Sequence, residues 1–249
     1  VLLHAEQKQY DIALKKCDKQ LQLVNEVPRA KAVIYNLKGG LYLAQKMPDK
    51  AEKAFDSALT ADPEYLRSYY ALARIYLNKQ QEDKAIAQYQ ALLEKNPKQT
   101  GPHMMLGTIY DMQQRFDLSE KHYREALTIN PEFAPAANNL AYLLSNRSKD
   151  VDEALTYARV AKEKLPKDPA VMDTLGWIYY QKGLYDSAIA ELNDSLELLA
   201  DNPTVNYHLG MAYYKKGENA KAKAQLEKAL SLSDEFDGAD EARKMLSEM

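Results

Sequence analysis

One stretch of the sequence decides the fold: residues 66–99, which read LRSYYALARIYLNKQQEDKAIAQYQALLEKNPKQ. Its apolar residues recur every three or four positions, as in Ala85, Tyr89 and Leu92. This spacing predicts amphipathic helices. The dipeptide Asn96-Pro97 ends the stretch, since proline disfavours helical geometry in the residue before it. The stretch therefore predicts two helices joined by a short turn.

The same pattern recurs along the chain with a period of 34 residues. Five sets of equivalent positions carry it through three consecutive units: Tyr35, Tyr69 and His103; Gly39, Ala73 and Gly107; Tyr42, Tyr76 and Tyr110; Phe55, Tyr89 and Tyr123; Pro63, Pro97 and Pro131. One extra residue near Asp150 shifts the register, which then continues to the C-terminal region. A fixed period predicts an array in which each unit buries its apolar face against its neighbours.

The period divides the chain into six full units within one array over 1–249. Their predicted bounds are 32–65, 66–99, 100–133, 134–168, 169–202 and 203–236. We expect a partial unit at 1–31, with an incomplete first helix and a second helix around Tyr10 to Val24. A capping helix is predicted at 237–249, where Ala242, Met245 and Leu246 are placed to cover the last unit.

Small and bulky residues of the pattern have complementary mechanical roles. A Gly or Ala, such as Gly39 or Gly176, lets the first helix of a unit approach its partner closely. Bulky residues such as Tyr42 and Tyr76 fill the space around that contact. We interpret both kinds as packing residues.

This pattern resembles the tetratricopeptide repeat family, and the resemblance covers nearly the whole chain. It is best kept in residues 32–133 and 169–236. The resemblance implies an all-α fold, a right-handed superhelical solenoid of tandem helix-turn-helix repeats. It also implies a concave surface that holds a protein or peptide ligand. Because fold does not fix function, the resemblance leaves the identity of that ligand open.

In this family, the resemblance implies that positions 2, 5, 9 and 12 of each unit line the concave surface. From these positions the candidate peptide-binding residues are Asn36, Tyr70, Arg74, Met104, Asn138, Tyr142, Asp173, Trp177, Tyr180, Tyr207, Met211 and Tyr214. Tyr and Trp offer large rigid contact areas, and Met adapts to different partners. The Asn and Asp side chains suit the backbone groups of an extended peptide. Alternatively, these side chains pack partly against neighbouring helices, or they only solvate the groove.

Composition and motifs argue against several other function classes. The net charge is −3 and the charges are interspersed, so we expect no nucleic-acid partner. No uncharged stretch is long enough to span a bilayer, so we expect no direct membrane insertion. Cys17 is the only cysteine, and no phosphate-binding, zinc-protease or nucleophile-elbow motif occurs. We therefore expect no enzyme activity, no cofactor and no metal.

The sequence thus predicts a non-catalytic scaffold or adaptor that binds a peptide or partner protein in its concave groove. One alternative is a recruiting or regulatory region of a larger bacterial enzyme, secretion or polysaccharide-export component, with more chain upstream. A second alternative is self-association into a homo-oligomer. The sequences of the stretches Asn138–Tyr142 and Thr174–Tyr179 resemble those of bacterial repeats. We therefore expect a soluble protein of the bacterial cytoplasm or periplasm.

Overall fold

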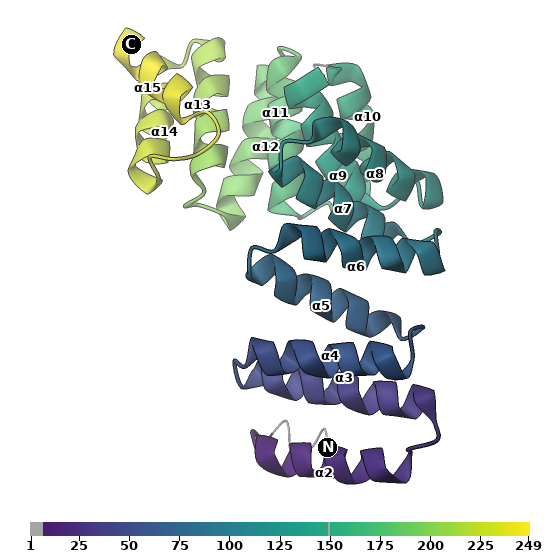
Figure 1. Ribbon diagram of the computed structural model, residues 1–249. Coiled ribbons are helices and arrows are strands. Elements are labelled where there is room, and N and C mark those ends of the chain that lie inside the picture. Colours follow the sequence, from purple (N-terminus) through teal and green to yellow (C-terminus); the bar gives the residue numbers. More distant parts are fainter. Residues whose placement is uncertain (1–6, 149) are drawn as a thin grey trace. The chain divides into compact units, whose positions relative to one another are not determined.

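The computed structural model describes residues 7–148 and 150–249, and within them the chain forms helices and turns and no strand (Figure 1). The predicted all-α fold of helix-turn-helix repeats is therefore confirmed. Contacts divide the chain into two compact units, residues 1–109 (unit 1) and 110–249 (unit 2). Each unit is a stack of helical pairs.

The described part of unit 1, residues 7–109, contains five complete helices and most of a sixth. They are α2 (Tyr10–Leu23), α3 (Pro28–Ala44), α4 (Pro48–Ala61), α5 (Leu66–Asn78), α6 (Glu82–Lys95) and α7 (Thr100–Met112), whose last residues belong to unit 2. The boundary predicted at residue 32 lies inside α3. This helix begins four residues earlier because Pro28 is a favoured first helical residue.

Unit 2 continues the alternation of first and second helices. Its elements are α8 (Phe116–Ile129), α9 (Ala134–Leu143), the π-helical turn η1 (Leu144–Ser148), α10 (Val151–Lys164), α11 (Pro169–Gln181), α12 (Tyr185–Leu198), α13 (Pro203–Lys216), α14 (Asn219–Leu232) and α15 (Ala239–Glu248). The turn η1 lies where the sequence period gains its extra residue. A π-helical turn accommodates one additional residue without ending the helix.

A repeated turn closes the first helix of five units. In the turn that follows each of these helices, a single residue adopts a left-handed conformation. These residues are Lys46, Gln80, Gln114, Gly183 and Gly217. The tyrosine carbonyl four residues earlier accepts an N–H from the far side of the turn, as in Arg115 N to Tyr110 O at 2.8 Å. This is the hydrogen bond of a Schellman C-cap. Equivalent tyrosines thus fix the turn through their backbone as well as packing through their rings.

The Asp-Pro and Asn-Pro dipeptides end the second helices through their side chains as well as through proline. The Asp62 carboxylate accepts the Glu64 amide at 2.9 Å. The Asn96 and Asn130 side-chain oxygens each accept the amide two residues further on at 3.1 Å. These Asx turns offer the backbone an alternative to continuing the helix.

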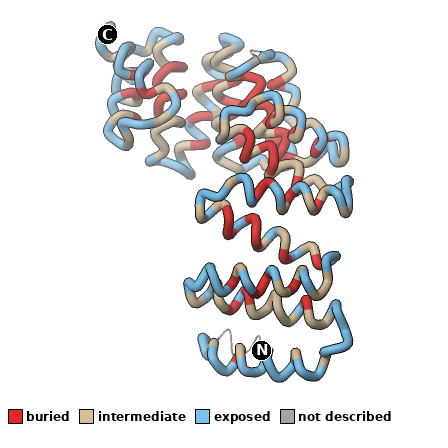
Figure 2. The backbone as a smooth tube through the Cα atoms, in the orientation of Figure 1, coloured by how far each residue is buried: buried red, intermediate tan, exposed pale blue. Residues whose placement is uncertain are grey.

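The core of each unit runs between paired helices, where the buried positions follow the inward faces (Figure 2). A Cβ added at Gly39 would lie 2.5 Å from the Phe55 ring, and one at Gly176 would lie 2.7 Å from Leu192. The small residues therefore allow the close approach inferred from the sequence. Cys17 is buried against Ala13 and Leu41, as expected for a packing residue.

Candidate functional site

The predicted peptide-binding residues lie on the first helices of both units. Four belong to unit 1 and eight to unit 2. In unit 2, Tyr142, Trp177 and Tyr207 come together around one cavity of about 180 Å³. We call this cavity the first-helix pocket. Its lining is Tyr142, Asn146, Arg147, Trp177, Tyr207, His208, Asp237, Gly238 and Glu241.

Trp177, on α11, is the centre of an aromatic stack beside this pocket. Its ring is stacked on Tyr180 at 4.7 Å and on His208 at 4.1 Å between ring centroids. The indole Nε1 donates to Asn146 Oδ1 at 2.8 Å, which links α11 to the π-helical turn η1. Packing and a hydrogen bond therefore hold the only tryptophan of the chain in place.

Two tyrosine–carboxylate pairs connect the pocket to the C-terminal segment. Tyr142 donates its hydroxyl to Asp237 Oδ2 at 3.3 Å, and Tyr207 donates to Glu241 Oε2 at 2.8 Å. Burial, followed by the nearby carboxylates, raises the pKa of both tyrosines well above the ordinary value of 10. The hydroxyls therefore remain protonated donors at neutral pH. The hydrogen bonds occupy only one oxygen of each carboxylate.

Asp173 does not face an open groove. His208 Nδ1 lies 2.7 Å from Asp173 Oδ1, and both side chains are largely covered. The expectation that this carboxylate is available for a peptide backbone is therefore corrected: it is engaged with His208 on the neighbouring first helix. The pair joins α11 to α13 behind the pocket.

Tyr207 and Met211 were expected to line the groove, but both are buried. Their side chains are 3% and 2% exposed, in a cluster with Leu226, Ala229 and Ala242. The cause is α15, whose Ala242, Met245 and Leu246 pack onto the last unit. Tyr207 still lines part of the pocket, whereas Met211 packs only in the core cluster.

The remaining predicted residues of unit 2 do not line the pocket. Tyr180 is half-buried, and burial raises its pKa to about 12. Tyr214 is half-buried on α13, and Asn138 is half-buried on α9. The buried Asn138 Oδ1 has no hydrogen-bond partner among the described residues. An amide oxygen of this kind is costly to leave unpaired.

The four predicted residues of unit 1 differ in their hydrogen bonds within the chain and in their exposure to solvent. Asn36 accepts a hydrogen bond from Ser68 at 3.2 Å, which ties two first helices together. Tyr70 is exposed, and its hydroxyl donates to Gln99 at 3.3 Å. Arg74 is exposed and Met104 is half-buried. None of these four side chains lines the first-helix pocket.

Sequence reasoning missed six residues of the pocket: Asn146, Arg147, His208, Asp237, Gly238 and Glu241. One signal could have found Glu241, which follows its partner Tyr207 by 34 residues, one full period. The helix α15 therefore continues the register as a further first helix. Asn146 and Arg147 lie in η1, where the extra residue breaks the pattern.

The pocket has no metal-binding character. Among residues 7–148 and 150–249, no three His, Cys, Asp or Glu side chains are grouped so that they could hold a metal ion. Within the same residues, no helix combines the length and the apolar character needed to cross a bilayer. The first-helix pocket can contact a ligand through hydrogen bonds, charges and aromatic rings.

The sequence matches four family models, which together span most of the chain. Three are described as tetratricopeptide repeat and match residues 42–109, 104–169 and 203–236. The fourth, described as TPR repeat, matches residues 176–217. No curated protein matches the sequence.

Solved structures with a similar fold include repeat proteins of several kinds. The APC/C hetero-tetramer Cut9–Hcn1 matches with 21% identity and a TM-score of 0.73, covering 98% of this chain and 47% of that one. The pilF protein of Pseudomonas aeruginosa matches with 17% identity and a TM-score of 0.71, covering 88% and 99%. YrrB, described as a TPR protein with an unusual peptide-binding site, matches with 21% identity and a TM-score of 0.60, covering 78% and 99%. Identities of this size show a shared fold alone.

Proposed function

Since this chain belongs to the tetratricopeptide repeat family, whose members bind protein partners, we propose that it is a non-catalytic scaffold or adaptor. Its ligand is a peptide segment of a partner protein, held on the first helices of unit 2. Similar structures include the protein assembly Cut9–Hcn1 and the peptide-binding protein YrrB. These likenesses support the class of function and leave the ligand to be argued from this chain.

The observation that carries the proposal is the first-helix pocket. It gathers side chains from α9, η1, α11, α13 and the C-terminal segment, so residues from three repeats meet at one cavity. A volume of about 180 Å³ suits one side chain of a partner better than a whole small-molecule ligand. The internal hydrogen bonds of Trp177 and Tyr142 hold the walls in place before any partner arrives. Such preorganisation lowers the entropic cost of binding.

The charges of the pocket favour a basic side chain as the inserted group. Asp237 and Glu241 are exposed, and each has one carboxylate oxygen beyond the tyrosine hydrogen bond. Arg147 is the one cation of the lining, and its guanidinium lies 4.3 Å from the centre of the Phe116 ring. The surplus negative charge attracts a Lys or Arg of the ligand, which donates charge-assisted hydrogen bonds.

A peptide-display selection on the whole chain tests this proposal. We expect the selected peptides to share a Lys or Arg. We also expect the double variant Asp237→Asn plus Glu241→Gln to bind them at least about tenfold more weakly. Asn and Gln still accept the tyrosine hydrogen bonds, so the variant removes charge while it keeps the fold.

A matched control is available on the second-helix face of unit 2. Asp194→Asn plus Glu197→Gln removes the same two charges from exposed positions of α12. This pair is expected to leave affinity unchanged. Equal binding by both double variants would refute the pocket as the binding site.

A further inference from the structure

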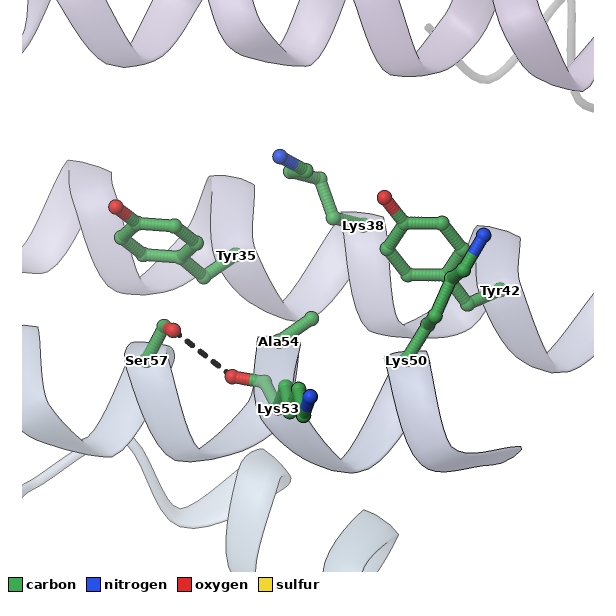
Figure 3. A pocket seen from close by; sticks show the side chains of 7 residues that line it. All are labelled: Tyr35, Lys38, Tyr42, Lys50, Lys53, Ala54 and Ser57. Carbon is green, nitrogen blue, oxygen red and sulfur yellow. Dashed lines mark hydrogen bonds between the residues drawn. The ribbon is translucent and has the colours of Figure 1, made fainter. Parts of the chain in front are cut away.

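A second cavity, of about 230 Å³, lies between α3 and α4 of unit 1 (Figure 3). We call it the lysine pocket. It is lined by Tyr35, Lys38, Tyr42, Lys50, Lys53, Ala54 and Ser57. It shares no residue with the first-helix pocket, and the proposed function does not use it.

Three lysines surround this cavity, and only one has an ionic partner. Lys38 Nζ lies 2.6 Å from Asp18 of α2, and its side chain is 17% exposed. Lys50 and Lys53 are exposed, and neither forms an ion pair within residues 7–148 and 150–249. The Lys50 ammonium lies 5.9 Å from the centre of the Tyr42 ring. Two of the three lysines therefore have no ion-pair partner among the described residues, although Lys53 interacts with the charge of Asp49.

Two acidic residues of α4 form their ion pairs with another helix and not with these lysines. Asp49 and Glu52 lie three residues apart and therefore on one stripe of the helix. Both carboxylates pair with Lys79 of α5, at 2.6 Å each. Lys50 and Lys53 occupy the next stripe, which faces the cavity. Two carboxylates of α4 are thus paired with another helix, although Asp49 also interacts with the charge of Lys53. The cavity keeps an excess of positive charge, because Lys50 and Lys53 form no ion pair among the described residues.

The cavity also offers hydroxyl donors and apolar walls. Tyr35 and Tyr42 are two helical turns apart on α3, with Lys38 between them (Figure 3). Within the described part of the chain, neither tyrosine hydroxyl is hydrogen-bonded. Ser57 donates to its own helix, at the Lys53 carbonyl 2.8 Å away, so its oxygen can still accept. Ammonium groups and phenolic hydroxyls are all donors to oxyanions.

We propose that the lysine pocket binds a phosphate monoester. A phosphate monoester carries close to two negative charges at neutral pH, which suits a cavity lined by three lysines. Lysine ammonium groups bind phosphate as point charges and do not require bidentate geometry. The volume leaves room for a small organic group between the tyrosine rings, so the ester fits better than the bare ion. The organic group of the ester is either aromatic or aliphatic.

Calorimetric titration of the whole chain with phenyl phosphate and with glycerol 3-phosphate tests the site. We expect saturable binding of at least one ester, weakened by added salt because exposed charges are screened. Tighter binding of phenyl phosphate would identify an aromatic phosphoester as the source, and tighter binding of glycerol 3-phosphate a small aliphatic one. Phenylacetate, a monoanion with the same ring, is expected to bind more weakly than either.

Two double variants decide whether the binding belongs to this pocket. Lys50→Gln plus Lys53→Gln is expected to lower affinity for the ester by about tenfold or more. The control, Lys121→Gln plus Lys167→Gln, removes two exposed lysines of unit 2 and is expected to change affinity less than about twofold. Circular dichroism checks that both variants fold. Absence of saturable binding, an equal loss in both variants, or phenylacetate binding as tightly as the esters would overturn the proposal.

Discussion

The two pockets of this molecule use tyrosines in opposite ways. In the first-helix pocket of unit 2, the hydroxyls of Tyr142 and Tyr207 are bonded to carboxylates of the C-terminal segment. In the lysine pocket of unit 1, the hydroxyls of Tyr35 and Tyr42 have no partner among the described residues. The first pocket has a surplus of negative charge and the second a surplus of positive charge.

This difference follows from what packs beside each pocket. In unit 2, α15 supplies Glu241, and the segment before it supplies Asp237, so acidic groups reach the first helices. In unit 1, Asp49 and Glu52 of α4 are bound by Lys79 on α5. One repeat pattern therefore produces two charge environments because the neighbouring helix, and not the repeat itself, decides which charges remain unpaired.

The largest expected effect comes from removing the segment that completes unit 2. Deleting residues 237–249 uncovers Tyr207, Met211 and Leu226. We expect a loss of about 3–5 kcal/mol in the free energy of unfolding of unit 2, comparable with emptying a large core site. The fluorescence of Trp177, measured during guanidinium unfolding, reports this unit.

Unit 1 provides the internal control for the deletion. Cys17 is the only cysteine and is buried, so its reaction with a thiol reagent reports the opening of unit 1. We expect the protection of Cys17 to be unchanged in the deletion variant. If Trp177 and Cys17 reported an equal loss of stability in the two units, the view that α15 stabilises unit 2 alone would be contradicted.

A smaller effect is expected from the aromatic stack. Trp177→Ala removes the ring stacked on Tyr180 and His208, and we expect a loss of about 3 kcal/mol in stability by circular dichroism. Trp177→Phe keeps an aromatic ring but loses the hydrogen bond to Asn146, and we expect about 1 kcal/mol. A Phe variant as unstable as the Ala variant would show that the indole hydrogen bond dominates.

The smallest effect concerns a surface charge pair of unit 2. Hydrogen bonding to Arg124 lowers the pKa of Glu153 below its ordinary value near 4.5. Its contribution is therefore present above that value and is lost as pH falls through the lowered pKa. Both side chains are about one-third exposed, so we expect Glu153→Gln to cost less than about 1 kcal/mol at pH 7.

The pH dependence of this cost distinguishes a charge effect from a packing effect. As pH falls through the lowered pKa of Glu153, the stabilities of the native chain and of Glu153→Gln should converge, because both residues are neutral below that pKa. A difference that stays constant between pH 7 and pH 3 would mean that the glutamate acts through shape alone. Urea unfolding at a series of pH values measures this difference.

The fold was predictable because its determinants are local and periodic. The period of 34 placed Tyr42, Tyr76 and Tyr110 at equivalent turns, and the structure gives each the same backbone hydrogen bond. The proline dipeptides ended the second helices where the sequence indicated. Such features depend on residues that are close in sequence, so they can be predicted from a single sequence.

The site was predictable only in part because its determinants come from distant segments. Tyr142 and Trp177, two of the residues chosen from the family positions, line the first-helix pocket, whereas their role in peptide binding stays a prediction. Met211 occupies an equivalent position but is buried, because α15 covers the last repeat and no other. Asp237 contacts Tyr142 across 95 residues of sequence, a pairing that no local pattern announces.

The central claim is that a partner peptide binds on the first helices of unit 2. Hydrogen–deuterium exchange of the whole chain, with and without a peptide obtained from the display selection, tests it most directly. We expect slower exchange at the pocket segments of α9, η1, α11 and α13 and at residues 237–241, with α10, α12 and α14 little changed. Slower exchange confined to the second helices or to unit 1 would contradict it.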